Sequence, residues 1–505
     1  MIRIFLLFLA LLFQIQCLFS QAVPSWVNAE KRRAEFPDGK YLTGFDSQVI
    51  RKTDNLQEVQ KNLLENAKIY LVQSIRTIIS ASATINTENR NSSTQEIFKQ
   101  SSSSFSQADL SGLKVNEFYD RKKKEAYAFV HLNIQDFITA EQNTLNAQSV
   151  VLAKKIETAR QYFNSGNRPL ALKTYLECFP LLREMEGRMA VILTLGNPEV
   201  SIPYSALSDS VSRAIASLRT GPRNTIEDLC LFISDGLKQQ IPENFNETIR
   251  MGSFTYMDSH IGSCFSTRLS TSLQPGLIEN GFELYYPDQT NKDNRYPWVL
   301  NGTYWLDGTN LKVIASLSNE KTGKTIASVE DFLPLKWLTE REIEYIPKNH
   351  QSIEALEKEL SKDEIVKPRL MVSLWTNKGD NPVYKNGETM KVFAQVDRPC
   401  FIRLIYYTAD GQRWLLDDSQ FLDEEKVNKP VLLGEFECTP PFGAEILQLV
   451  AQTIEFARLN TQKSGRDEII LDDDRTTIQI TRGMQKKQPD LQIAEKRINI
   501  TTVEK

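Results

Sequence analysis

The three histidines of the chain, His131, His260 and His350, limit the nucleophilic chemistry that its residues could support. They fall in three segments that are predicted to fold separately, whereas a catalytic triad brings nucleophile, base and carboxylate together. Asp258-Ser259-His260 has suitable residue types, but adjacent residues do not readily reach triad geometry. No Gly-x-Ser-x-Gly motif marks a nucleophile. We therefore predict no catalytic residues and a protein that is not an enzyme.

Three short stretches match part of a known ligand-binding motif. Each lacks the flanking elements or partner motifs that such a site requires. Gly323-Lys324-Thr325 matches the end of a phosphate loop, yet Ser318 replaces the first glycine and no helix is predicted to follow. Ser318-Asn319-Glu320-Lys321 has the Ser-x-x-Lys spacing of penicillin-interacting enzymes without their partner motifs in order. Asp472-Asp473-Asp474 lacks the alternating acidic positions of a calcium loop and is predicted to be a solvated turn. No cofactor and no metal site is predicted.

The six cysteines bear on both compartment and covalent structure. Cys17 lies in the amino-terminal apolar segment, and the other five are Cys178, Cys230, Cys264, Cys400 and Cys438. Cys230 with Cys264 and Cys400 with Cys438 each lie within one predicted domain, so both pairs are candidate disulfides in an exported chain. The other interpretation is that all five pack as small buried apolar side chains. No Cys-x-x-Cys motif supports metal or redox chemistry.

Five aromatic residues are candidate ligand or partner contacts. Trp298, Tyr304 and Trp305 are close together in a predicted meander, and Trp375 and Trp414 lie in the last domain. Aromatic clusters can stack on sugars or anchor a protein partner. At alternating strand positions such residues more often belong to the core, and that alternative is favoured here.

The composition is that of a globular, multidomain protein. The chain has 505 residues, of which 41% are hydrophobic and 25% charged, so three or four domains are expected. Lys and Arg number 60 against 64 Asp and Glu, which gives a net charge of −4. This balance does not favour a nucleic-acid partner.

The amino terminus predicts export. Arg3 precedes a wholly apolar run from Ile4 to Phe13, and a small-x-small pattern ends at Ala22. These features are typical of a cleavable signal peptide over residues 1–22. Acylation of Cys17 is a less favoured alternative, because no small residue directly precedes it. No other stretch has the ~18 apolar residues of a membrane span, so we expect a soluble or peripherally attached chain.

Residues 23–135 are expected to form a small α/β domain. A short strand at 41–45 precedes an amphipathic helix whose apolar residues recur every three or four positions over Leu56–Ile78. Two alternating strands within 113–134 are joined by Arg121-Lys122-Lys123-Lys124. That basic run could meet an anionic partner or form a solvated hairpin tip, and the solvated tip is favoured.

Three motifs of this domain resemble a family of small bacterial envelope lipoprotein domains. They are Pro24-Ser25-Trp26-Val27, Tyr41-Leu42-Thr43-Gly44-Phe45 and Ile75-Arg76-Thr77-Ile78. Domains of this family also begin flagellar outer-membrane-associated proteins. The resemblance covers about a fifth of the chain and implies envelope association without catalysis.

Residues 136–220 are predicted to be helical. Gly166-Asn167 should end one helix, and Pro169 suits the first turn of the next. The spacing resembles one tetratricopeptide hairpin, carried by Ala159, Tyr162, Gly166, Ala171, Tyr175 and Cys178. Because the period does not recur, a helical spacer is favoured over a peptide-binding groove.

Residues 221–339 are expected to form a second α/β domain. The predicted order is a helix at 226–241, a strand at 249–256, a second helix and a three-strand meander within 298–329. The domain resembles the flagellar outer-membrane and curli-secretion lipoprotein group. The resemblance is carried by Met251-Gly252-Ser253-Phe254, the 262–273 helix, Leu300-Asn301-Gly302-Thr303-Tyr304, and the stretch from Lys321 to Ser328. It implies the fold and an envelope location, but no secretion pore.

A charged helical linker at 340–367 leads to a β-rich domain at 368–505. Within this domain, Thr476–Thr481 is predicted to be a strand. The domain resembles an uncharacterised bacterial β-sandwich-like domain that is often appended to kinases and caspase-like proteases. The resemblance is carried by Tyr384-Lys385-Asn386-Gly387-Glu388, Cys400-Phe401-Ile402-Arg403-Leu404, Asp410-Gly411 and the segment from Ile493 to Ile500. It implies a module that binds a ligand or a partner.

The sequence thus predicts an α+β multidomain protein with two small α/β sandwiches, a helical region between them and a carboxy-terminal β-sandwich-like domain. The function that fits best is a non-enzymatic exported binding or scaffold protein of the cell envelope. Its expected location is the periplasm or the outer membrane, and its expected partners are other envelope proteins or peptidoglycan. Peripheral membrane association is allowed, and the oligomeric state stays open. The alternative is a sensing module that binds glycans or peptides through the aromatic-rich carboxy-terminal domains.

Overall fold

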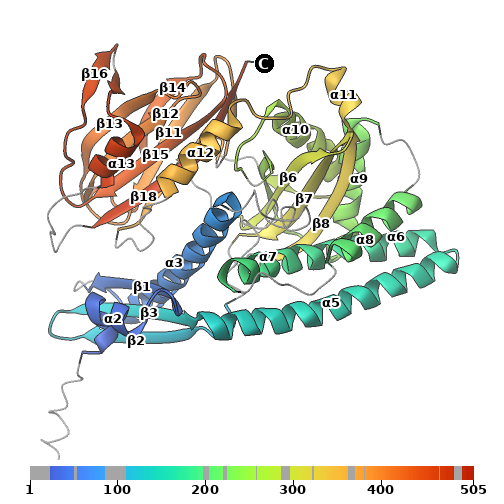
Figure 1. Ribbon diagram of the computed structural model, residues 1–505, viewed down its shortest axis with the longest axis horizontal. Coiled ribbons are helices and arrows are strands. Elements are labelled where there is room, and N and C mark those ends of the chain that lie inside the picture. Colours follow the sequence, from blue (N-terminus) through green and yellow to red (C-terminus); the bar gives the residue numbers. More distant parts are fainter. Residues whose placement is uncertain are drawn as a thin grey trace, which may run out of the picture. The chain divides into compact units, whose positions relative to one another are not determined.

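A computed structural model gives the fold (Figure 1). The structure describes residues 23–50, 54–85, 110–196, 204–219, 224–257, 259–285, 296–320, 324–361, 370–379, 381–465, 467–482 and 492–504. The predicted signal peptide, with Cys17, and the Thr322-Gly323 turn lie outside these residues. The chain forms two compact units, a smaller one (Met1–Leu71 and Gly112–Phe137) and a larger one (Val72–Ser111 and Ile138–Lys505).

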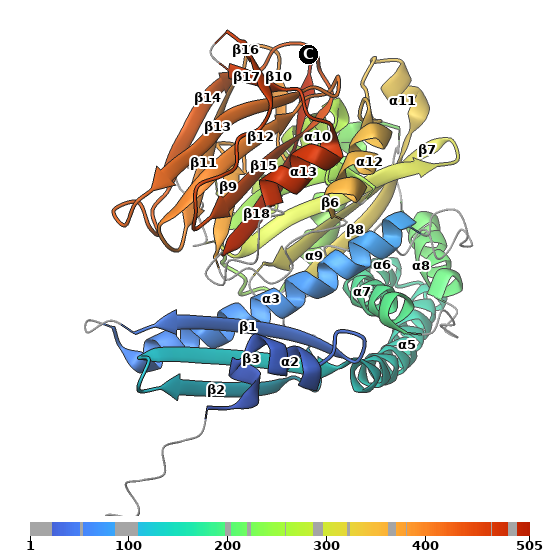
Figure 2. The ribbon, with the colours of Figure 1, turned by 60° about the vertical axis from the view of Figure 1, so that its left-hand side comes forward.

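The smaller unit is an antiparallel sheet with a helix on each face (Figure 2). Its elements are η1 (Ser25–Val27), α2 (Ala29–Glu35), β1 (Tyr41–Val49), the first part of α3 (Leu56–Ile85), β2 (Lys114–Asp120) and β3 (Glu125–Asn133). The strand order is β1-β3-β2. The strand, helix and hairpin predicted for this segment are therefore present.

Side-chain alternation along β1 sends neighbouring residues to opposite faces of this sheet. Gly44 faces α3, and a Cβ atom there would lie 1.9 Å from the carbonyl oxygen of Ala67. Phe45 faces α2, where the guanidinium of Arg32 lies 3.7 Å from the centre of its ring. Trp26 and Phe129 stack beside it, with ring centres 5.7 Å apart. The absence of a side chain at Gly44 therefore lets α3 approach the sheet closely. On the other face of the sheet, aromatic rings fill the space.

After the second part of α3, the larger unit continues with four helices. They are α5 (Ile134–Asn164), which starts in the smaller unit, α6 (Arg168–Leu176), α7 (Phe179–Leu195) and α8 (Tyr204–Leu218). Gly166 takes a left-handed φ of 83°, and the Asn167 side chain accepts a hydrogen bond from the amide of Leu170. Pro169 follows in the first turn of α6. The predicted break between the two helices is thus confirmed.

A five-stranded sheet of order β5-β4-β6-β7-β8 follows the helices. Its elements are α9 (Ile226–Gln240), β4 (Ile249–Tyr256), α10 (Cys264–Glu279), β5 (Leu284–Tyr285), β6 (Trp298–Asp307), β7 (Asn310–Asn319), β8 (Thr325–Pro334) and α11 (Leu335–Thr339). The strands β6, β7 and β8 pair antiparallel in sequence order. The predicted meander is therefore confirmed.

A buried charge network joins α7 to this sheet. The Arg183 guanidinium lies 2.6 Å from a Glu186 oxygen and 3.0 Å from a Glu330 oxygen, and all three side chains are at most 5% exposed. The ammonium of Lys312 lies 3.5 Å from the Glu330 carboxylate. Burial alone would raise the pKa of Glu330, but Lys312 and Arg183 together hold that pKa below its ordinary value. We use the name charge network for Arg183, Glu186, Lys312 and Glu330.

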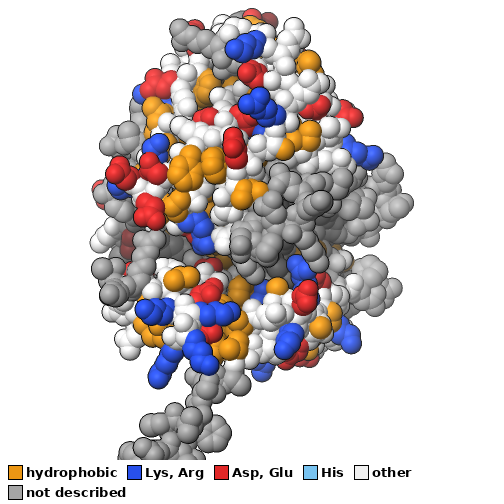
Figure 3. Space-filling model, turned by 90° about the vertical axis from the view of Figure 1, so that its left-hand side faces the viewer, with side chains coloured by type: hydrophobic (Ala, Val, Ile, Leu, Met, Phe, Trp, Pro, Cys, Tyr) orange, Lys and Arg blue, Asp and Glu red, His pale blue; other side chains and the backbone are white. Residues whose placement is uncertain are grey.

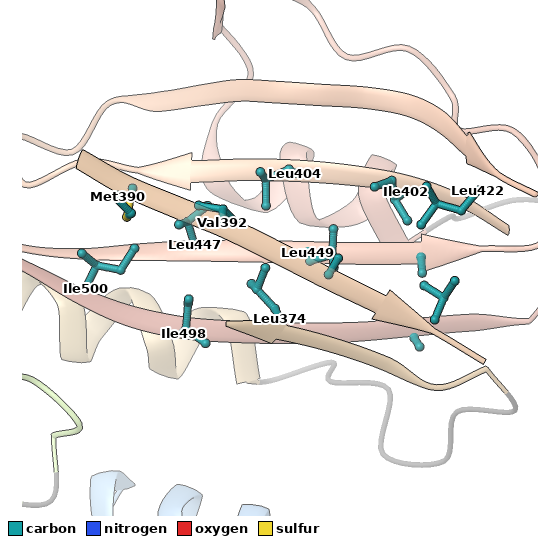
Figure 4. Packing of buried hydrophobic residues seen from close by; sticks show 14 of the residues in the cluster. Leu374, Met390, Val392, Ile402, Leu404, Leu422, Leu447, Leu449, Ile498 and Ile500 are labelled. Atoms are coloured by element: carbon teal, nitrogen blue, oxygen red, sulfur yellow. The ribbon is translucent and has the colours of Figure 1, made fainter. Parts of the chain in front are cut away.

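The carboxy-terminal part is a β-sandwich. Its elements are α12 (His350–Ser361), β9 (Val372–Thr376), β10 (Val383–Lys385), β11 (Thr389–Val396), β12 (Cys400–Tyr407), β13 (Arg413–Leu422), β14 (Val431–Glu437), β15 (Ala444–Gln452), β16 (Thr461–Ser464), β17 (Asp467–Ile470), α13 (Asp474–Arg482) and β18 (Ile493–Val503). A seven-stranded sheet, β10-β18-β15-β12-β13-β17-β16, faces a three-stranded sheet, β14-β11-β9. Leu374, Val392, Leu404 and Leu449 are among the side chains between the sheets (Figure 4).

The helices α12 and α13 cover the other face of the seven-stranded sheet through a second apolar cluster, which includes Ile353, Ile446 and Ile478. The strand predicted at Thr476–Thr481 is wrong, because this segment is the helix α13. The Asp473 side chain accepts a hydrogen bond from the amide of Thr476 and so begins the helix. Hydrogen bonds from the backbone amide and from the side chain of Thr476 lower the pKa of Asp473.

The fold class is therefore α+β and multidomain, with a β-rich carboxy-terminal region, as the sequence predicts. Among the helices of the described segments, none has both the length and the hydropathy of a membrane span.

Candidate functional site

The strand β13 is irregular where it pairs with β12. Three residue steps on β12, from Ile402 to Ile405, face five steps on β13, from Gln420 to Leu415, so β13 carries two extra residues. Within this bulge Ser419 has a left-handed φ of 57°. Bulges redirect side chains and occur often beside functional sites. Here the bulge places two consecutive acidic residues at the sheet surface.

A groove of about 620 Å³ opens beside this bulge. Its lining comes from β13, from the start of β16 and the segment before it, and from β17. The lining residues are Leu415, Leu416, Asp417, Asp418, Arg458, Leu459, Asn460, Thr461 and Glu468. Six of these nine are polar or charged, and the charged ones are three carboxylates and one guanidinium. We call this feature the bulge groove.

A buried arginine supports one wall of the bulge groove. Arg403 is fully buried, and its Nε donates a hydrogen bond of 2.7 Å to the Asp418 carboxylate. Its Nη2 donates to the carbonyl oxygen of Ala457 at 2.6 Å, and its guanidinium lies 4.5 Å from the centre of the Phe456 ring. The atom Nη1 is buried, and no hydrogen-bond partner for it is found in the described part of the chain. Arg403 therefore fixes the position of the Asp418 carboxylate at the groove. Its Nη1 stays available as a hydrogen-bond donor.

The other two carboxylates of the groove are held differently. Burial raises the pKa of Asp417, and the neighbouring Asp418 carboxylate adds to the rise. Glu468 accepts a hydrogen bond of 2.5 Å from the hydroxyl of Thr461. Such a groove can accept hydrogen bonds from ammonium, amide or hydroxyl groups of a ligand. Across the described segments, no group of three or more His, Cys, Asp or Glu residues is arranged to hold a metal ion.

The predicted aromatic contacts are mostly core residues. Tyr304 is fully buried, with its hydroxyl 2.5 Å from the Ser263 hydroxyl, and Trp305 is 4% exposed. Trp375 is 3% exposed and stacks on Phe393. These three rings cannot form a contact surface, because packing against their own sheets covers them.

Trp298 and Trp414 are only half-buried. Trp298 meets Phe245 edge to face. Trp414 directly precedes groove residue Leu415 on β13 and pairs with Ile469 of β17. Of the five predicted contacts, only Trp414 is next to the bulge groove along its strand.

The candidate disulfides are not formed. All five described cysteines are thiols, and burial raises the pKa of Cys178, Cys230 and Cys400 to about 12 and that of Cys438 to about 11. Cys400 and Cys438 belong to the core of the sandwich. The interpretation as small buried apolar side chains therefore holds, with Cys264 the one partly exposed thiol.

His131 and the hydroxyl of Ser259 are engaged in structural contacts. His131 lies in β3, with its ring centre 4.4 Å from that of Phe36 and 5.9 Å from that of Tyr41, and burial lowers its pKa. The hydroxyl of Ser259 donates a hydrogen bond of 2.5 Å to the carbonyl oxygen of Tyr256, so it is engaged in its own turn. Asp258 lies outside the described residues.

A second ionisable group with an altered pKa lies at the start of β15. Glu445 is 2% exposed, and burial raises its pKa to about 7. Its carboxylate accepts a hydrogen bond of 2.5 Å from the hydroxyl of Tyr406. The neighbouring residue Ala444 exchanges backbone hydrogen bonds with the side chain of Asn349, which directly precedes α12. Glu445 therefore changes charge near neutral pH where the linker joins the sandwich.

Replacing Glu445 with Gln is expected to remove a pH-dependent loss of stability. The folded-state pKa of about 7 is above the ordinary 4.5, so the free energy of unfolding should fall as the pH rises through this window. A shift of this size corresponds to about 3 kcal/mol. Urea unfolding should be measured at pH 5 and at pH 8. The free energy of unfolding of the variant, relative to that of the native chain, should be higher at pH 8 than at pH 5. A difference between the two proteins that is equal at both pH values would contradict the assignment.

No protein-family model matches the chain, and no curated protein matches it in sequence. A solved structure, that of the secreted protein HP1454 from Helicobacter pylori, is similar over 64% of this chain and 98% of its own, with 10% identity and a TM-score of 0.20. A similarity at this level establishes neither a shared fold nor a shared function.

Proposed function

We propose that this chain is a non-enzymatic, exported binding protein of the bacterial cell envelope, and that its carboxy-terminal sandwich holds a ligand in the bulge groove. The observation that carries the proposal is the bulge groove itself, a large polar recess built on an irregular strand and supported by a buried arginine. The predicted signal peptide supports export. Two versions differ in the occupant: a segment of another envelope protein, as in a scaffold, or a peptide or glycan fragment, as in a sensor.

The lining favours the second version. The side chains of Asp417, Asp418 and Glu468 accept hydrogen bonds, and Arg458 and Asn460 donate them. Peptidoglycan fragments present hydroxyl, amide and amine groups within one small molecule, so they complement such a lining. The flanking leucines offer apolar contact to the body of the ligand. Binding pockets commonly combine these two kinds of surface.

Soluble peptidoglycan fragments are expected to bind and to raise the melting temperature of the protein. The double variant Asp417→Asn/Glu468→Gln should weaken binding at least tenfold, because each lost charged hydrogen bond costs about 1.5–3 kcal/mol. The variant Glu424→Gln/Glu425→Gln removes two exposed carboxylates of the same domain outside the groove and should bind as the native chain does. Isothermal titration calorimetry measures all three proteins.

Crosslinking in intact envelopes tests the scaffold version. A protein partner should crosslink to positions around the groove, and Asp417→Asn/Glu468→Gln should reduce that product. If neither fragments nor envelope partners bind, or if both double variants lose binding equally, the bulge groove is not the binding site.

A further inference from the structure

The hairpin that joins β2 and β3 forms a rigid basic tip on the smaller unit. The Asp120 carboxylate accepts hydrogen bonds from the amides of Lys122 and Lys123, at 2.8 and 3.1 Å. The amide of Ile50 donates to the carbonyl oxygen of Lys124 at 2.7 Å. These bonds fix the backbone of the turn. We use the name basic tip for Arg121, Lys122, Lys123 and Lys124 together with Val49.

The basic tip carries an excess of positive charge, with four cations against the two flanking carboxylates Asp120 and Glu125. All four cationic side chains are exposed, and no ion pair of the described residues includes them. The two acidic neighbours are engaged elsewhere, since Asp120 binds backbone amides and Glu125 accepts a hydrogen bond of 2.7 Å from Tyr127. The lower part of the face in Figure 3 shows Lys and Arg side chains gathered at the surface. Four consecutive cations thus stand out on a chain whose net charge is −4.

An exposed apolar side chain lies at the same end of the sheet. Val49, the last residue of β1, pairs with Glu125 directly after the hairpin, and it is 60% exposed. A soluble anion would gain nothing from this side chain. Clusters of about four to eight Lys and Arg residues near a bilayer bind anionic lipid headgroups, and an apolar side chain beside them adds contact with the acyl boundary.

We propose that the basic tip docks the smaller unit on the surface of an anionic lipid bilayer. The four cations meet the lipid phosphates, and Val49 enters the boundary between headgroups and acyl chains. The contact is electrostatic and reversible, because this number of cations and one apolar side chain give modest affinity. The proposal does not depend on the bulge groove, which lies in the other unit.

Vesicle binding tests the proposal directly. The protein, purified in the form that cells export, is mixed with vesicles of phosphatidylcholine and phosphatidylglycerol in a two-to-one ratio, and vesicles of phosphatidylcholine alone set the baseline. The variant Lys122→Gln/Lys123→Gln should weaken binding to the anionic vesicles about 25-fold, since each cation near such a surface contributes about fivefold. Val49→Ser should weaken it by a smaller factor. Added salt should weaken binding of the native chain.

The matched control is Lys31→Gln/Arg33→Gln, which removes two exposed cations from α2 of the same unit and should leave binding unchanged. Near-ultraviolet circular dichroism confirms that each variant is folded. Equal loss in both double variants would show that only net charge matters and would overturn the proposal. So would native binding to anionic vesicles no stronger than the baseline. Tighter binding to a soluble acidic polysaccharide, unchanged in Val49→Ser, would assign the tip to a polyanion instead of a membrane.

Discussion

Replacing Arg183 with Met is expected to lower the free energy of unfolding of the larger unit by about 3–5 kcal/mol. The guanidinium is 5% exposed and binds both Glu186 and Glu330, which are themselves almost fully buried. Without it, Lys312 is the one remaining cation of the charge network. A buried carboxylate that loses its partner must either stay charged in a poor solvent or take up a proton. Urea unfolding followed by tryptophan fluorescence measures the loss.

The exposed pair of Arg160 and Glu157 provides a control for the charge network. Their side chains are 55% and 53% exposed, so Arg160→Met should cost less than about 1 kcal/mol. The triple variant Arg183→Met/Glu186→Gln/Glu330→Gln should recover part of the loss, because neutral amides remove the unpaired charges. If Arg160→Met and Arg183→Met cost the same, the network does not stabilise the contact between α7 and the sheet.

The consequence of the charge network for architecture is that the helical region packs directly against the five-stranded sheet. Its residues come from α7 and from the meander strands β7 and β8, which are over a hundred residues apart in sequence. All four of its members are buried, at positions where an apolar side chain would be expected. Buried networks of this kind stabilise one docking geometry against others, because a shifted contact would leave a charge unpaired.

Local sequence signals predicted the elements that depend on local interactions. The meander was predictable because strong turn residues such as Asp307-Gly308 separate strands of alternating character. Asn167 and Pro169 marked a helix boundary through capping and a fixed φ, and both act within one turn of the chain. The helix α13 was missed because its Thr and Ile residues favour strands, whereas Asp473 and packing against the sheet decide the outcome.

The bulge groove was beyond sequence reasoning, because it depends on contacts between distant segments. The feature of the sequence that could have indicated this groove is Asp417-Asp418, because two consecutive acidic residues are unusual within a strand. The extra residues of β13 are visible only once its register with β12 is known. The burial of Arg403 depends on Phe456 and Ala457, more than fifty residues away. The aromatic residues, by contrast, were conspicuous in sequence but serve mainly the core.

Replacing Gly44 with Ala is expected to unfold the smaller unit or to destabilise it by more than about 3 kcal/mol. The new methyl group would lie 1.9 Å from the carbonyl oxygen of Ala67 and 3.0 Å from a methyl group of Val130. The first of these atoms belongs to the backbone of α3, which cannot move without disturbing the buried side chains of Leu63 and Leu71. A small gain from reduced unfolded-state entropy does not offset this clash.

Hydrogen exchange measured by mass spectrometry tests this contact within the intact chain. Amides of β1 and of the first part of α3 should lose protection, while the helices and sheets after Phe137 keep it. Gly39 provides the control in the same unit. A methyl group there meets no atom within 4 Å, so Gly39→Ala should leave protection unchanged or raise it slightly. Normal protection of β1 in Gly44→Ala would mean that α3 can move away from the strand, and that the close approach at Gly44 is not what holds the helix on the sheet.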